Sequence, residues 1–181
     1  MNDRKLSLGS RLLVGGIAGI VGTMAMTGAM RRLHQKLPPK ERYPLTPREI
    51  VDSAGAQTDA ELGNDAAKDL TIAAHFTYGA ACGSLLAAVN PRIGPRGGAA
   101  AGAAVWLGSY MGWLPAAGLL KPATEHPPRR NALMVGVHLV WGAATALAMR
   151  ELIIARGTMI EAGPDRDAPP EGQRDPNPRA D

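Results

Sequence analysis

The sequence predicts an all-α protein, a four-helix transmembrane bundle, and three observations lead to this fold class. All 20 Lys and Arg and all 16 Asp and Glu residues lie outside four long stretches. Each of these stretches has 19 to 24 residues, and about 20 apolar residues span the hydrocarbon core of a bilayer. A short motif also recurs in the second and fourth stretches. The charge-free stretches are 12–30, 70–91, 97–120 and 131–149.

The bulk composition alone resembles that of a soluble domain, with 45% hydrophobic residues and a mean hydropathy of −0.09. The segregation of the charges excludes a soluble enzyme with one water-facing surface, and it indicates a multi-pass protein of a bacterial inner membrane. Basic residues flank the apolar stretches, which suits anionic lipid headgroups and not nucleic acid. The single cysteine, Cys82, excludes a disulfide within the chain.

The predicted organisation has three parts. A polar N-terminal tail covers 1–11, a transmembrane domain covers 12–155, and a disordered, proline-rich tail covers 156–181. A long polar loop over 34–69 holds a short helix at about 47–54, because Thr46-Pro47-Arg48-Glu49 has the pattern of a capping box. The predicted membrane-spanning helices cover 12–33, 70–89, 97–114 and 131–155.

An internal repeat suggests how these helices are arranged. The pattern His-x-x-aromatic-Gly-Ala begins at His75 in the second helix and again at His138 in the fourth. A Gly-x-x-x-Gly pair stands near the start of the first and third helices. The chain therefore reads as two tandem two-helix repeats, and an even number of helices in each unit makes the repeats parallel.

Several small and aromatic residues are predicted to pack inside the bundle. Glycines one turn apart let helix backbones approach closely in lipid, where apolar burial does not drive association. The helix faces that carry these glycines pack against other helices of the same chain or, as the alternative, form a dimer interface. The candidate packing and intramembrane polar residues are Gly15, Gly19, Gly79, Gly83, Gly98, Gly102, Tyr78, Tyr110, Trp141 and Arg130. The last of these, Arg130, is also a candidate for binding a phosphate headgroup or a substrate.

The two histidines of the repeat are the only candidate metal ligands. His75 and His138 lie several residues inside their helices and toward the same side of the membrane, so we expect both rings to face the bundle interior. A metal or heme would need both rings to point at one axis. The alternatives are proton or ion handling, or a structural role in which each imidazole hydrogen-bonds a neighbouring group. No cofactor is assigned.

Several segments together resemble the YagU-like family of uncharacterised four-span inner-membrane proteins. The resemblance covers about residues 10–155 and implies four helices in a bacterial inner membrane. It implies no reaction, because the family carries none. The matching segments are Gly15–Gly19, Leu37–Leu45, His75–Ala80, Tyr110–Pro115, His126–Asn131 and His138–Gly142.

Three hypotheses of function follow from these features. The first is a non-enzymatic accessory or scaffold subunit whose partners are the lipid bilayer, a second copy of the chain or other membrane proteins. The second is a small transport or permeation unit that works as an oligomer. The third is a heme- or metal-binding protein that uses the histidine pair.

Overall fold

The computed structural model describes residues 6–58 and 63–160, and all regular secondary structure in these two ranges is helical. The longer helices pack against one another, and short helical segments join them. The segments are α1 (Leu8–His34), η1 (Pro39–Glu41), α2 (Thr46–Gln57), α3 (Asn64–Val89), α4 (Pro95–Gly108), η2 (Ser109–Trp113), α5 (Leu114–Ala116), η3 (Ala123–Glu125), α6 (Pro128–Ala155) and η4 (Arg156–Ile160).

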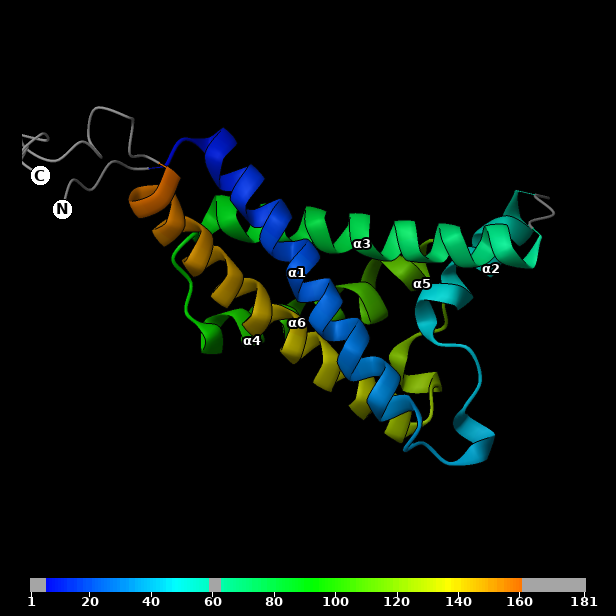
Figure 1. Ribbon diagram of the computed structural model, residues 1–181. Coiled ribbons are helices and arrows are strands. Elements are labelled where there is room, and N and C mark those ends of the chain that lie inside the picture. The colour runs from blue at the N-terminus through cyan, green and yellow to red at the C-terminus, as the bar shows by residue number, and fades with distance from the viewer. Residues whose placement is uncertain (1–5, 59–62, 161–181) are drawn as a thin grey trace, which may run out of the picture.

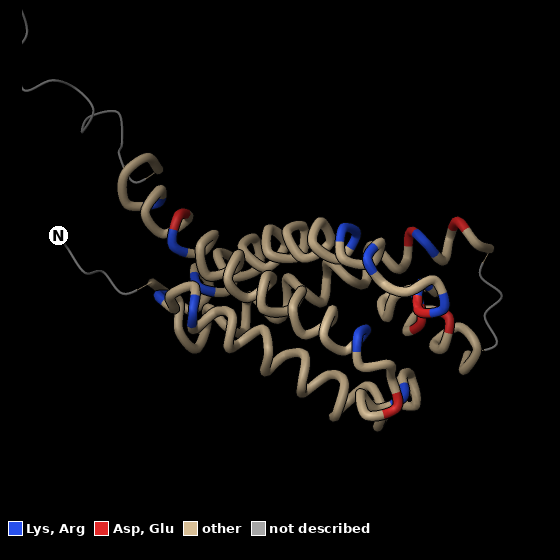
Figure 2. Tube along the Cα trace, turned by 90° about the horizontal axis from the view of Figure 1, so that it is seen from below, with Lys and Arg blue, Asp and Glu red and all other residues tan. Residues whose placement is uncertain are grey.

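Three helices in the described ranges are long and apolar enough to cross a membrane: α1, α3, and α6 with its continuation to Ile160. Figure 2 shows charged residues gathered toward the two ends of the molecule, with a long uncharged section between them. Large apolar side chains stand exposed along this section, including Leu13 at 66% and Leu85 at 66%. An exposed apolar belt between charged ends identifies a membrane-embedded, multi-pass protein.

The helices do not form a closed ring of equal contacts. Helix α1 packs extensively on α3 and on α6, and α4 packs on α6, whereas α3 and α4 make no extensive contact with each other. In Figure 1 the start of α1 and the end of α6 lie at one end of the bundle, and the starts of α3 and α6 lie at the other, which we call the loop end. Helix α2 covers the loop end beside α3.

Glycines mediate two of the close helix crossings. A Cβ atom added at Gly15 or Gly19 would overlap the α3 backbone at Gly83 or Gly79. On the other side of the bundle, a Cβ at Gly98 would overlap Gly142 of α6. At these points the helices pack backbone against backbone, as small residues permit in lipid.

The predicted helix ends need correction at both termini. Helix α1 begins at Leu8, because the Ser7 side chain accepts a hydrogen bond from the Ser10 backbone N–H at 3.2 Å and caps the helix. Residues 8–11 are therefore helical and are not part of a polar tail. At the other terminus, 156–160 continue α6 as a π-helical turn, whereas the rest of the predicted tail lies outside the described residues.

The predicted third span is broken, and a proline explains the break. Pro115 has no N–H to donate to the carbonyl of Met111 four residues earlier, and its ring clashes with that carbonyl. The chain responds with a π turn from Ser109 to Trp113, in which Gly112 has non-helical dihedrals (φ −116°, ψ −107°). Helix α4 proper has 14 residues and is about 21 Å long, which is shorter than the hydrocarbon core.

The capping box predicted before α2 is wrong. The helix begins at Thr46 itself, with Leu45 at the N-cap position and no side-chain cap. The carboxylate of Glu49 turns away from the helix start and accepts a hydrogen bond from Arg130. Glu49 therefore forms an ion pair with Arg130 and does not cap the start of α2.

Candidate functional site

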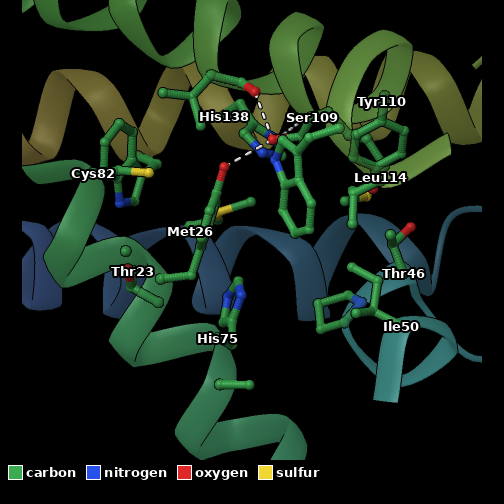
Figure 3. Close-up of a pocket in the computed structure, with 18 of the residues that line it drawn as sticks. Thr23, Met26, Thr46, Ile50, His75, Cys82, Ser109, Tyr110, Leu114 and His138 are labelled. Atoms are coloured by element: carbon green, nitrogen blue, oxygen red, sulfur yellow. Dashed lines mark hydrogen bonds between the residues drawn. The ribbon is translucent and has the colours of Figure 1, made fainter. Parts of the chain in front are cut away.

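A pocket of about 260 Å³ lies where α3 and α4 separate. Its walls come from α1, α2, α3, α6 and the segment from α4 to α5, and Figure 3 shows their side chains converging on it. Most of the lining is apolar. The lining residues from the described parts of the chain are Thr23, Met26, Thr46, Pro47, Ile50, Val51, Ala74, His75, Tyr78, Gly79, Cys82, Val105, Ser109, Tyr110, Trp113, Leu114, Met134, His138 and Trp141.

Aromatic side chains are concentrated in this pocket. The whole chain has only one Phe, three Trp and three Tyr, and four of these seven residues line the pocket together with two of the four histidines. The four are Tyr78, Tyr110, Trp113 and Trp141. Aromatic faces and edges favour offset or perpendicular contacts with other rings, so these walls are suited to an apolar guest that carries a ring.

His138 is fixed rigidly in the pocket wall. Its side chain is 8% exposed, and its Nδ1 donates a hydrogen bond of 2.7 Å to the carbonyl of Met134 one turn earlier on α6. The Tyr110 ring stands perpendicular to the imidazole, with 6.3 Å between the ring centroids. Because Nδ1 carries the proton, Nε2 of the neutral ring is an acceptor.

His75 occupies a different wall of the same pocket, on α3 (Figure 3). Its Nε2 is buried and has no hydrogen-bond partner in the part of the chain that the structure describes. The two histidines therefore both line the bundle interior, but they differ in bonding. His138 fits the structural alternative, because its Nδ1 bonds a neighbouring carbonyl. The buried Nε2 of His75 does not fit it.

Two imidazoles do not make a metal centre by themselves. In the described ranges no group of three or more His, Cys, Asp and Glu side chains lies close enough together to hold a metal ion. A metal at His75 and His138 would therefore take its remaining ligands from outside these residues. The pocket is also small for a heme. An apolar cavity of about 150 Å³ binds benzene, so 260 Å³ corresponds by proportion to about ten non-hydrogen atoms.

One side chain connects α3 to the π turn at the edge of the pocket. The Tyr78 hydroxyl lies 2.9 Å from the Ser109 hydroxyl, and the Tyr78 and Trp113 rings are 5.9 Å apart. Ser109 also donates to the carbonyl of Val105 at 2.8 Å, which leaves its oxygen free to accept from Tyr78. Tyr78 and Trp113 are 40% and 46% exposed, so this contact lies at the outer boundary of the pocket.

Arg130 lies outside the pocket and fastens the long loop to the start of α6. It is 3% exposed, and its Nη1 and Nη2 donate to the carbonyls of Glu41, Tyr43 and Pro44 and to the Glu49 carboxylate. The guanidinium also lies 3.6 Å from the centre of the Tyr43 ring. These bonds engage both terminal nitrogens, so the guanidinium fixes the loop to α6, and the binding of a headgroup or a substrate by Arg130 stays a prediction.

The other predicted site residues fall into two sets. The pocket takes in Gly79 together with His75, His138, Tyr78, Tyr110 and Trp141. The remaining glycines lie at helix crossings and not at the pocket. They are Gly15, Gly19, Gly83, Gly98 and Gly102.

Sequence reasoning named Tyr110 but missed its neighbours in the pocket wall at the start of the π turn and directly after it. Ser109 and Leu114 line the pocket, and both are buried. The sequence signal was Gly112 followed by Pro115 inside an apolar stretch, because glycine and proline together mark a place where a helix is broken. Segments of π-helix occur frequently at functional sites.

Comparisons with family models, with curated proteins and with solved structures return no match to this chain.

Proposed function

We propose that this protein is a non-enzymatic, membrane-embedded binding subunit that holds a small lipophilic molecule in its inter-helix pocket. One observation carries the proposal: the pocket where α3 and α4 separate is enclosed largely by apolar and aromatic side chains. Ligand pockets in proteins are apolar concavities with a few fixed polar groups, and His138 and Ser109 are such groups here. The protein acts as an accessory or scaffold subunit for its partners in the membrane.

The proposal includes the arrangement of the chain. Four crossings, the fourth provided by α4 together with its broken extension to Ala116, return the described chain to the end where it began. Two helix pairs, α1 with α3 and α4 with α6, pack through glycines, and this supports two parallel two-helix repeats. A bacterial inner membrane is the location that this arrangement and the resemblance to the YagU-like family favour.

The native cysteine provides a test of pocket binding. Cys82 lines the pocket and is half-buried, and it is the chain's single thiol. In detergent-solubilised full-length protein, naphthalene should slow the reaction of Cys82 with N-ethylmaleimide, as measured by intact mass. Naphthalene has ten non-hydrogen atoms and matches the volume of the pocket.

The control moves the thiol to the lipid-facing surface. In a Cys82→Ala/Met24→Cys variant, the thiol replaces a side chain that is 63% exposed on α1 and does not line the pocket. Naphthalene should leave its reaction rate unchanged. Equal slowing of both thiols would show partitioning into detergent and would refute pocket binding.

A further inference from the structure

We propose that the ligand of this pocket is a hydroxylated aromatic molecule of about two fused rings, whose hydroxyl group donates a hydrogen bond to Nε2 of His138. The inference rests on the proposed function, because it names the class of molecule that the pocket takes. It identifies the ligand by three properties: the size of the guest, its aromatic ring and its hydrogen-bond donor.

The size follows from the volume. An apolar cavity of 150 Å³ binds benzene, which has six non-hydrogen atoms, so 260 Å³ corresponds to about ten or eleven. Two fused six-membered rings with one substituent have this size. A lipid acyl chain or a porphyrin exceeds this volume and would extend out of the pocket.

The ring follows from the walls. Four of the chain's seven Phe, Trp and Tyr residues line this pocket, although aromatic residues make up only 4% of the sequence. The fixed perpendicular contact between Tyr110 and His138 shows that the walls already pack ring against ring. A flat guest extends this packing, whereas a saturated guest of the same skeleton does not.

The donor follows from the tautomer of His138. The Met134 carbonyl can only accept, so the 2.7 Å bond places the imidazole proton on Nδ1. Nε2 then presents a lone pair at the ring edge farther from the α6 backbone, and it makes no hydrogen bond within the residues that the structure describes. The His138 side chain is more than nine-tenths buried, and an open acceptor in a largely apolar pocket favours a guest that donates to it.

Three compounds with one carbon skeleton separate these properties. The first, 2-naphthol, has the ring and the donor. In 2-methoxynaphthalene the ring is kept and the donor is lost, and in decahydro-2-naphthol the donor is kept and the ring is lost. We expect 2-naphthol to protect Cys82 from N-ethylmaleimide at about five- to tenfold lower concentration than the methyl ether, as one hydrogen bond predicts. It should also protect at about three- to tenfold lower concentration than the saturated alcohol.

The outcomes are distinguishable. If none of the compounds, naphthalene included, protects Cys82, the proposed function itself fails. If the methyl ether binds as tightly as 2-naphthol, the assignment of a donor is overturned. If the saturated alcohol binds as tightly, the assignment of an aromatic ring is overturned. These comparisons use the wild-type chain and do not depend on the folding of any variant.

A pair of variants tests the role of His138 directly. His138→Phe keeps a ring and removes Nε2, so the preference for 2-naphthol over its methyl ether should disappear while naphthalene still binds. His126→Phe is the matched control, because His126 also lies 6.3 Å from the Tyr110 ring but does not line the pocket. A full preference retained in His138→Phe would overturn the assignment of Nε2 as the acceptor.

Discussion

At the scale of single residues, Arg130 shows how one buried charge organises a polar loop. Its guanidinium donates to three carbonyls and one carboxylate of 41–49, and Leu45 of the same segment packs against the apolar core. Breaking a buried ion pair by removing one partner leaves the other groups without compensation. Arg130 therefore fixes the polar part of the loop, in addition to the apolar contacts of Leu45 with the core.

Arg130→Leu should detach this loop. We expect a loss of about 1–3 kcal/mol in the free energy of unfolding, because several part-buried acceptors lose their donor. Limited proteolysis should show faster cleavage between Lys36 and Arg48. Arg129→Leu is the matched control, since Arg129 is exposed and precedes Arg130 directly. Similar cleavage rates in the two variants would contradict the anchoring role.

Gly79 tests the close packing of α1 against α3. A Cβ atom at this position would overlap the Thr23 side chain, which itself donates to the Gly19 carbonyl at 2.8 Å. Overpacking of a tight contact costs about 1–3 kcal/mol for added methylenes, so Gly79→Leu should lower the melting temperature in detergent markedly. Gly28→Leu, on a part of α1 where an added Cβ meets no neighbouring atom, should change it little. An equal shift in both variants would remove the packing argument.

At the scale of elements, the sequence predicts the existence of helices well and their internal breaks poorly. The uncharged stretches identified four apolar helical segments, because charge exclusion is a local property of the chain. The π turn at Ser109–Trp113 depends on the consequence of Pro115 for the preceding carbonyls, and a periodic pattern does not show it. Similarly, the predicted capping box at Thr46 does not form, because the Glu49 carboxylate accepts a hydrogen bond from Arg130 instead.

The same limit applies to the pocket. Depth and spacing in the sequence placed His75 and His138 toward the interior. The separation of α3 from α4, which creates the space between them, follows from three-dimensional packing. The periodic pattern of apolar residues predicts which face of a helix points inward. It does not predict how far apart two helices such as α3 and α4 lie.

The bridge between α3 and the π turn predicts how the pocket opens. Tyr78 contacts Ser109 and Trp113 at the pocket boundary, and α3 and α4 have no extensive packing to replace this contact. Tyr78→Ala should therefore raise the rate at which N-ethylmaleimide reacts with Cys82 several-fold. Tyr78→Phe, which loses the hydroxyl contact and keeps the ring, should give a smaller increase.

The control for the opening experiment is Ile72→Ala, an exposed position on the same helix that does not line the pocket. Its labelling rate should equal that of the wild-type protein. An unchanged rate in Tyr78→Ala would show that Tyr78 does not limit access to the pocket.

At the scale of the whole molecule, the positions of the helix ends bear on the number of membrane crossings more directly than the number of long helices does. Only three helices in the described ranges have membrane length, yet α6 begins at the loop end of the bundle, opposite the end where α3 finishes. The segment 95–127 must therefore carry the chain from one end to the other, even though α4 is short and interrupted. We therefore propose an even number of crossings, which predicts that both termini lie on the same side of the membrane.

Cysteine labelling of the intact membrane tests this parity. In a Cys82→Ala background, Asp3→Cys and Asp175→Cys should react alike with a membrane-impermeant maleimide in spheroplasts, because four crossings return the chain to its starting side. Thr124→Cys, an exposed position in the loop before α6, should give the opposite response. If 95–127 stayed on one side, only three crossings would remain, and Asp3→Cys and Asp175→Cys would then respond oppositely. The three variants therefore separate a complete fourth crossing from a helix that enters the bundle and leaves on the same side.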